Sequence, residues 1–471
     1  MPSLVLKNFR IIDEDTDMTG SVAVEGGLIG ELIPAEADYA RLEEAERSAA
    51  MVIDGRNFPG TEGRLPLLMP AFVDLHAHFR DPGFFEKGDE SGRAAEIPAI
   101  AETLESACLA AAAGGYGTVV CMANTKPPVD NLEQAAFLKG RADALGLIDL
   151  YPALSLTKNM EGRELSDITK LRAPGDHPFF PRLLSEDGRD IAGEALFLAA
   201  LKEARRLGLP VSCHCDAGGA EAAAAKAAGS PRGVWSRIEE NNATRRAIAL
   251  GMQAGARIHI AHVSTMEAAE MIRQAKAPGR AAGGFALTCE AAPHHIACTD
   301  ADARRLGDES FGRVNPPLRT EADRRALIAA VLDGTIDAVA TDHAPHTGGD
   351  KAAGAPGFTG LETAFAACFT RLVPAEGSGS GLKKLSSLMS AGPARIIGLG
   401  AGPGGRGRIA AGLRADLCIA GDVFWTVEPG QFRSRGKTSP FAGQRLRGKI
   451  MVTINQGRVV YDARRWGAEY V

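Results

Sequence analysis

The sequence lacks several features that would place it in a specialised class of protein. Its 471 residues include eight cysteines but no Cys-x-x-Cys pair, a pattern that favours reduced thiols over a disulfide framework. No run of about 18 uncharged apolar residues occurs, and the first residues lack a basic segment followed by a long apolar one. These absences predict a cytoplasmic protein with no membrane-spanning segment and no signal peptide.

The charge balance excludes two further classes of partner. Lys and Arg number 53 against 58 Asp and Glu, which gives a net charge of −5 and no electrostatic attraction to nucleic acid or an anionic membrane. Hydrophobic residues make up 45% and charged residues 24%, as in ordinary soluble globular proteins. A chain of this length suits two or three average domains, or one large barrel with an accessory domain.

After Pro70 the sequence alternates between apolar, strand-like segments and segments with helical periodicity. The strand candidates begin near residues 71, 117, 148, 179, 209, 257, 285 and 336. The helical candidates between them cover residues 102–113, 132–144, 193–207, 243–252, 266–275 and 321–332. This alternation predicts an α/β fold with a (β/α)8 barrel, because parallel strands need helical crossovers.

Both ends of the chain read as short β segments separated by turns. The N-terminal segments are Ser3–Leu6, Ser21–Val24 and Met51–Gly55, with a helix-prone patch at 39–47. The C-terminal segments are 407–409, 415–419, 449–453 and 457–460. We expect the two ends to pair into a small β-sandwich accessory domain, formed by residues 1–68 and 399–471, around a metal-dependent barrel at residues 69–398.

The most informative segment is Val73–Arg80, where an apolar strand ends in two histidines. His76 and His78 are two residues apart, so in an extended chain both imidazoles point to the same face and can share a metal ion. A His-x-His pair alone is a weak indication, and two polar residues that close a strand are as common. Barrel enzymes place their chemistry at the C-terminal ends of the strands. Candidate ligands at the other strand ends therefore distinguish a metal site from two polar residues that close a strand.

Four more predicted strand ends carry candidate ligands, namely Asp187, His214, His262 and Asp342. Each has an ordinary alternative: His214 and His262 as hydrogen-bonded histidines, Asp187 as a turn residue and Asp342 as a helix cap. Ligands at five strand ends around one barrel mouth favour a metal site over these separate alternatives. Imidazole and carboxylate groups suit zinc, although other first-row divalent metals use the same ligands.

These residues lie in longer motifs, through which the sequence resembles the class I dihydroorotases of the amidohydrolase superfamily over nearly its whole length. The motifs are Asp74–Gly83, Ala123–Pro127, Glu186–Gly188, His262–Thr265, Pro293–His295, Val314–Arg319, Asp333–Asp337, Thr341–His346 and Ser439–Gly443. The resemblance implies a hydrolase acting on cyclic amides. Its reaction would be the reversible cyclisation of N-carbamoyl-L-aspartate to L-dihydroorotate in pyrimidine biosynthesis.

The resemblance also implies one or two zinc ions and a catalytic residue. The implied zinc ligands are His76, His78 and Asp342 for one ion, His214 and His262 for the second, and Asp187 as the bridge. Related hydantoinases, dihydropyrimidinases and allantoinases usually bridge with a carboxylated lysine, and no lysine occupies 179–189. Asp342 is expected to act as general base and then general acid around a metal-activated hydroxide.

The substrate contacts are likewise implied by the resemblance. They are His78, Arg80, Asn124, Asn315, His346, Gly357 and Phe358. Arg80 offers a bidentate fork to the substrate carboxylate. The alternative interpretations are a surface arginine for Arg80 and turn residues for Asn124 and Asn315. The loop with Gly357 and Phe358 reads Ala-Pro-Gly-Phe, where family members often have Ala-Pro-Phe-Gly.

Two local features depart from the family pattern. Residues 87–101 look like an insertion after the first strand, on the catalytic face, where they would cover the site or contact a partner. Cys215 directly follows His214 and is expected to be a packed thiol, with metal coordination as the alternative.

Two other functions stay open. One is a cyclic amidohydrolase of the hydantoinase, dihydropyrimidinase or allantoinase type, against which Arg80 together with Asp187 argues. The other is a non-catalytic scaffold for aspartate carbamoyltransferase, against which the complete ligand set argues. Beyond the small-molecule substrate, the partner hypotheses are a second copy in a homodimer and aspartate carbamoyltransferase.

Overall fold

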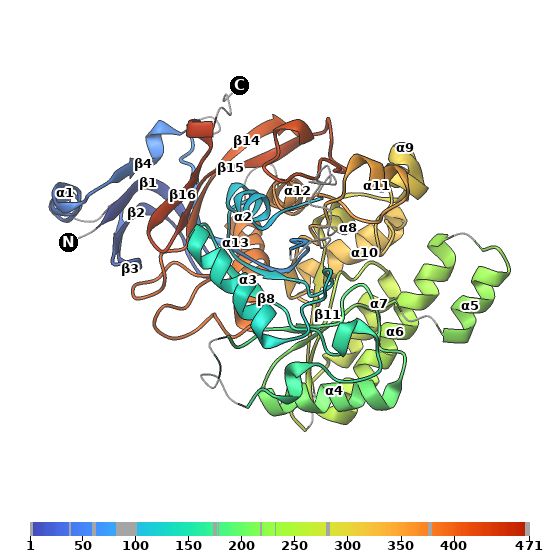
Figure 1. The fold of residues 1–471 in the computed structure, drawn as a ribbon. Coiled ribbons are helices and arrows are strands. Elements are labelled where there is room, and N and C mark those ends of the chain that lie inside the picture. The colour runs from blue at the N-terminus through green and yellow to red at the C-terminus, as the bar shows by residue number, and fades with distance from the viewer. Residues whose placement is uncertain are drawn as a thin grey trace, which may run out of the picture.

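The described structure has two parts (Figure 1): a larger one of parallel strands and helices, and a smaller one built around a β-sheet. The computed structural model describes residues 3–36, 39–58, 63–81, 101–172, 177, 179–216, 219–230, 232–278, 283–374 and 379–466. The expected insertion at residues 87–101 lies outside these residues, apart from Ala101. Within the part of the chain so described, no helix has both the length and the apolar content needed to cross a membrane.

Eight short parallel strands lie at the centre of the larger part. They are β6 (Phe72–Ala77), β7 (Tyr116–Cys121), β8 (Asp149–Pro152), β9 (Leu184–Ser185), β10 (Val211–Cys213), β11 (Arg257–Ile260), β12 (Ala286–Ala291) and β13 (Ala338–Val339). They form two sheets, in the orders β6-β7-β8 and β9-β10-β11-β12-β13. Isolated parallel bridges join Leu154 to Leu184 and Ala77 to His343, at the edges of these sheets.

All eight predicted strands are therefore present, and the fourth begins later than expected. The residues near Phe179 form no strand, and β9 starts only at Leu184. Pro181 precedes it and has no N–H to contribute to a ladder. Every residue of β7 is buried, as expected for parallel strands covered on both faces.

Helices alternate with the strands, and several of them, such as α3 against β8 and α6 against β11, pack against the strands. They are α2 (Leu104–Ala113), α3 (Leu132–Leu145), α4 (Glu194–Leu207), α5 (Gly219–Ala227), α6 (Arg232–Ala254), α7 (Met266–Ala275), α8 (Pro293–Ala297), α9 (Asp300–Leu306), α10 (Glu321–Leu332), α11 (Gly348–Ala352), α12 (Ala364–Leu372), α13 (Gly379–Ser386) and α14 (Gly392–Ile396). The segment predicted at 243–252 is the second half of the longer α6. Capping boxes at Thr103 and Thr320 fix the starts of α2 and α10.

Strands from both ends of the chain form one sheet beside this part, as expected (Figure 1). They are β1 (Leu4–Ile12), β2 (Asp17–Glu25), β3 (Leu28–Pro34), β4 (Val52–Asp54), β5 (Leu67–Pro70), β14 (Leu417–Thr426), β15 (Arg445–Asn455) and β16 (Arg458–Asp462), with α1 (Tyr39–Ser48) between β3 and β4. The order is β16-β15-β14-β5-β1-β2-β3, with β4 also on β1. The strand predicted at 407–409 is wrong, because Gly407 has φ 91° and interrupts the extended backbone.

Candidate metal centre

The candidate ligands leave five different strands and meet at the carboxyl ends of those strands. His76 belongs to β6 and His78 follows it, while Asp187, His214, His262 and Asp342 follow β9, β10, β11 and β13. All six side chains are buried, with 1% to 7% of each residue exposed. Parallel strands end at a common edge, which explains how residues far apart in the sequence come together.

One group of possible ligands consists of His76, His78 and Asp342. Their ligand atoms all lie within 4.8 Å of one another. Asp342 Oδ1 is 3.4 Å from His78 Nε2 and 3.7 Å from His76 Nε2. The carboxylate therefore faces both imidazoles of the His-x-His pair, which point to the same side as the alternation along a strand predicts.

A second group consists of His76, Asp187 and His262, again with all ligand atoms within 4.8 Å of one another. Asp187 Oδ1 is 3.2 Å from His76 Nε2 and 3.8 Å from His262 Nε2, and Asp187 Oδ2 is 3.5 Å from His78 Nε2. Asp187 thus belongs to the second group and also faces His78 of the first. His214 is beside the second group, with Nδ1 at 3.1 Å from Asp187 Oδ1 and 2.8 Å from His262 Nε2.

These contacts set the charge of the site. Burial by itself would raise the pKa of Asp187, but His76 and His214 outweigh it and hold that pKa well below its usual value. Burial also opposes the charged form of His214, yet Asp187 raises the pKa of His214 to about 10. For His76, Asp187 likewise overcomes burial and raises the pKa well above its usual value. Without a metal, the site is therefore an ion-paired cluster of carboxylates and imidazolium groups.

The residues fit a divalent metal ion. His76 Nε2 and Asp187 Oδ1 are buried and make no hydrogen bond, although they lie 3.2 Å apart. Burying a nitrogen and a carboxylate oxygen without a hydrogen bond lowers the stability of the fold unless another partner, such as a bound metal ion, interacts with them. Convergent imidazole and carboxylate donors are the usual ligands of zinc and of related first-row metals.

The backbone is strained at three positions of the site. His262, Asp342 and Arg80 have φ values of 32°, 46° and 60°, in the left-handed region that residues other than glycine rarely adopt. Strain of this kind persists where the surrounding structure enforces it and concentrates at functional sites. The unusual backbone conformation sets the direction of the side chains of His262 after β11, Asp342 after β13 and Arg80 after β6.

The predicted substrate residues divide between the ligands and the rim of the site. Arg80 Nη2 lies 3.2 Å from His346 Nε2, and Arg80 Nε donates to Pro345 O at 3.3 Å. Burial, and then the charge of Arg80, lower the pKa of His346 to about 4, so this imidazole is neutral near pH 7. Arg80 and His346 thus present a cation and a neutral imidazole side by side.

The two asparagines predicted to bind substrate contact the ligands directly. Asn124 Oδ1 is 2.9 Å from His78 Nδ1, and Asn124 Nδ2 donates to Asp187 Oδ2 at 3.0 Å. Asn315 Nδ2 is 3.3 Å from His214 Nε2. Asn124 therefore orients ligands in this structure and Asn315 lies against one, which the sequence pattern had not predicted.

Gly357 and Phe358 lie on a loop that is tied down by its own contacts. The carbonyl of Gly357 accepts from Lys351 Nζ at 2.9 Å, and the carbonyl of Phe358 accepts from Ala344 N at 2.8 Å. The Phe358 side chain is buried and its ring lies 5.4 Å from that of His294. The loop is thus held next to the strand end that carries Asp342.

Comparison with known proteins identifies the family. The model of the family described as "Amidohydrolase family" matches residues 67–460. The chain belongs to the amidohydrolase family. A dihydroorotase of Clostridium botulinum is 34% identical over 461 residues, covering 97% of this chain and 99% of that protein. A dihydroorotase of Anaeromyxobacter dehalogenans is 36% identical over 473 residues, or 98% of each chain.

A solved structure shows a similar fold. The L-hydantoinase (dihydropyrimidinase) of Arthrobacter aurescens superimposes with a TM-score of 0.77 at 24% identity, covering 100% of this chain and 98% of its own. Since the identity is low, this likeness concerns the fold alone.

One residue of this amidohydrolase site was missed by sequence reasoning. Glu290, in β12, is 1% exposed, and its Oε1 lies 3.2 Å from His76 Nδ1. Burial by itself would raise the pKa of Glu290, but His259 and His76 lower it to about 2. The one available indication was an acidic residue inside the apolar segment 285–292, which alone is compatible with many roles.

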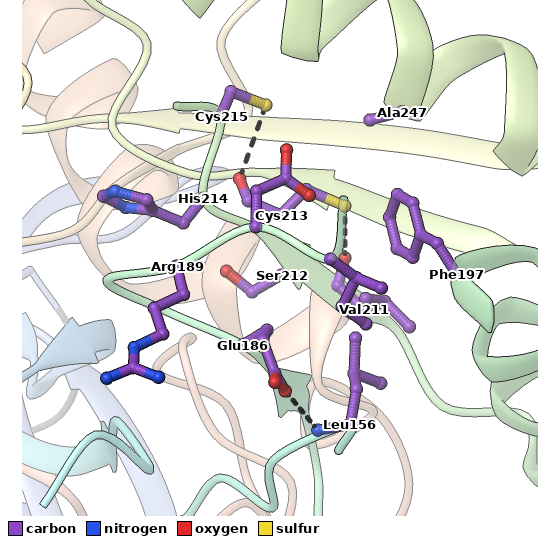
Figure 2. Close-up of a pocket in the computed structure, with 12 residues that line it drawn as sticks. Leu156, Glu186, Arg189, Phe197, Val211, Ser212, Cys213, His214, Cys215 and Ala247 are labelled. Carbon is purple, nitrogen blue, oxygen red and sulfur yellow. Dashed lines mark hydrogen bonds between the residues drawn. The ribbon is translucent and has the colours of Figure 1, made fainter. Parts of the chain in front are cut away.

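Cys215 lies outside both ligand groups. Its thiol donates to Cys213 O at 3.7 Å, and burial raises its pKa well above the usual value. Figure 2 shows the His214 imidazole and the Cys215 thiol pointing to different sides of the chain. This geometry matches the expected packed thiol.

Proposed function

We propose that this amidohydrolase is a zinc-dependent dihydroorotase, which reversibly cyclises N-carbamoyl-L-aspartate to L-dihydroorotate. The observation that carries the proposal is the pair of metal-ligand groups around Asp187, with Arg80 and His346 beside them. Relatives named dihydroorotase at 34% and 36% identity over nearly the whole chain support it.

The proposed site holds one or two zinc ions in the two groups already described. His76, His78 and Asp342 form the first group, and Asp187, His262 and the neighbouring His214 complete the second. Zinc bound there would lower the pKa of a water molecule towards neutrality and polarise the substrate carbonyl.

The protein's own residues supply proton transfer and binding. Asp342, whose Oδ1 faces His78 and His76, accepts the proton of the attacking water at its carboxylate and delivers it to the leaving ring nitrogen. In the direction of cyclisation the same carboxylate takes the proton of the ureido nitrogen. The Arg80 guanidinium pairs with the substrate carboxylate, with His346 as a neutral donor or acceptor beside it.

The remaining substrate contacts stay within the same proposal. Asn315 would contact the pyrimidine ring, and His78 and Asn124 would reach substrate from the ligand side. Backbone groups of Gly357 and Phe358 would contact it from the loop next to Ala344.

We also propose the complete architecture. The eight parallel strands would close into a (β/α)8 barrel, supported by the bridges Leu154–Leu184 and Ala77–His343. The terminal sheet would fold on itself as a β-sandwich, supported by a separate apolar core whose residues come from both chain ends. The domains would then be residues 1–68 and 399–471 around a barrel at 69–398. A cytoplasmic location, a homodimer and association with aspartate carbamoyltransferase stay predictions.

A substrate panel tests the proposal against the hydantoinase alternative. Zinc-supplied protein would be assayed with dihydroorotate, hydantoin, dihydrouracil and allantoin, and in reverse with carbamoyl aspartate, each alone and with aspartate carbamoyltransferase. We expect turnover of dihydroorotate and carbamoyl aspartate and a fall of about 100- to 10,000-fold in Asp342→Asn, because general acid–base catalysis contributes that much. Preferred turnover of a substrate without a carboxylate would contradict the proposal, and undiminished activity of Asp342→Asn would contradict the mechanism.

A further inference from the structure

A buried chain of polar side chains lies beneath His76, on the side away from the ligand groups. Glu290 Oε1 is 3.2 Å from His76 Nδ1, and Glu290 Oε2 is 2.9 Å from His259 Nε2. His259 Nδ1 is in turn 2.9 Å from Thr288 Oγ1. Exposure of Glu290, His259 and His76 does not exceed 1%, so water does not replace these hydrogen bonds.

Strand register explains why the chain is continuous. Thr288 and Glu290 are two residues apart on β12 and therefore point to the same face. His259 of β11 is paired in register with Thr288, which places its imidazole between these two side chains. His259 and Thr288 thus lie at one level of the sheet, with Glu290 two residues closer to the carboxyl end of β12.

The contacts define the hydrogen-bonding state of His76. A carboxylate only accepts hydrogen bonds, so His76 donates from Nδ1 to Glu290. Its Nε2 is then the atom that faces Asp187 and Asp342, at 3.2 and 3.7 Å. The second imidazole, His259, donates to the other oxygen of Glu290 and fixes the carboxylate in turn.

His76 is the one member shared by the two ligand groups among the described residues. The ring nitrogen of His78 that points away from the ligands contacts a neutral amide, Asn124 Oδ1. The buried charge of Glu290, which contacts the Nδ1 atom of His76, therefore acts on both ligand groups at once. A carboxylate in this position fixes the tautomer and makes the imidazole a stronger donor to a metal.

We propose that Glu290 and His259 are positioning residues that set the metal affinity of both ligand groups through His76. Thr288 completes the chain at its far end. The inference rests on the proposed metal centre, and it concerns residues that contact neither substrate nor metal.

The test measures metal binding instead of activity. Zinc affinity would be determined by competition with a chelator, and the visible absorption of the cobalt-loaded protein would report ligand geometry. Glu290→Gln keeps the shape and removes the charge, and we expect zinc binding about 10- to 100-fold weaker with an altered cobalt spectrum. His259→Gln and Thr288→Val should weaken zinc binding in the same direction, with the smaller effect from Thr288→Val.

Glu362→Gln is the matched control, because Glu362 is a carboxylate that accepts from the backbone N–H groups of Arg433 and Ser434 instead of a ligand. It should leave zinc affinity and the cobalt spectrum unchanged. Wild-type affinity and spectrum in both Glu290→Gln and His259→Gln would overturn this inference alone. A wild-type protein that binds neither metal would overturn the proposed metal centre together with the inference.

Discussion

At the scale of single residues, the site is governed by charges placed where water cannot screen them. His76 and His214 face the Asp187 carboxylate at 3.2 and 3.1 Å, and the pKa of each imidazole is raised in consequence. Both contacts therefore favour the protonated form of the imidazole in the metal-free protein. A metal ion that binds such an imidazole must displace its proton, because only the neutral imidazole is a ligand.

Zinc affinity should consequently rise with pH. Below its pKa of about 10, His214 is protonated in the metal-free state, so the dissociation constant should fall by about tenfold per pH unit as this proton is displaced. The increase should level off near the pKa of His214, about 10. Chelator competition at several pH values, with proton release measured in weak buffer, checks this. An affinity that is flat above pH 7 would show that neither imidazole is protonated there.

Arg80 should not be replaceable by lysine. Arg80→Lys keeps the charge but loses the planar fork and the contacts to His346 and Pro345. We expect kcat/KM for dihydroorotate to fall by about 10- to 100-fold, the equivalent of a lost charged hydrogen bond. Steady-state kinetics would measure this, with Arg408→Lys near the terminal sheet as the control. Equal kinetics in both variants would show that Arg80 does not bind the substrate.

At the scale of elements, the regular segments could be predicted and the contacts between them could not. The periodicity of α10 and the apolar runs of β7 and β11 are local properties, so their positions were predicted within a few residues. β9 was misplaced because its two residues are too short to show a pattern. Glu290 contacts a residue 214 positions away in the sequence, and no local pattern indicates which strand lies next to it.

The loop that follows α11 offers a test at this scale. Gly357 has φ 144°, and a Cβ there would lie 2.4 Å from Ala344 O. Gly357→Ala should shift the loop that carries Phe358 and destabilise the protein by about 1–3 kcal/mol, with reduced activity.

Gly349→Ala is the control for this loop, because a Cβ at Gly349 meets its nearest atom at 3.8 Å. It should be neutral or slightly stabilising. Denaturant unfolding and activity of both variants would be compared. Equal behaviour of the two would mean that the loop tolerates a side chain at Gly357.

At the scale of the whole molecule, ion pairs join the segment that leads into β14 of the terminal sheet to the parallel strands. Arg406 donates to Asp149 Oδ2 and to Thr118 Oγ1, both at 2.6 Å, and Arg414 donates to the same Asp149 oxygen at 2.7 Å. Arg414 also pairs with Asp416 at 2.8 Å. The pairing of both chain ends was predictable from their β segments, whereas this network was not, since it depends on how two separate cores meet.

Removal of Arg406 should therefore be costly. Arg406→Leu leaves Asp149 and Thr118 buried without one of their main partners, and we expect a loss of about 3–5 kcal/mol of unfolding free energy. Arg408→Leu removes an exposed ion pair to Asp15 of 3.8 Å and should cost less than about 1 kcal/mol. Urea unfolding of both variants decides. Similar losses would mean that the Arg406 network adds nothing beyond a surface pair.

The most direct test of the central claim is a zinc titration of metal-stripped protein, with bound zinc and the rate of dihydroorotate hydrolysis measured in the same samples. We predict no measurable turnover without metal, and a rate that rises in proportion to bound zinc until the site is filled. Zinc bound to His76 and its neighbours without any hydrolysis of dihydroorotate, with or without aspartate carbamoyltransferase, would contradict the account.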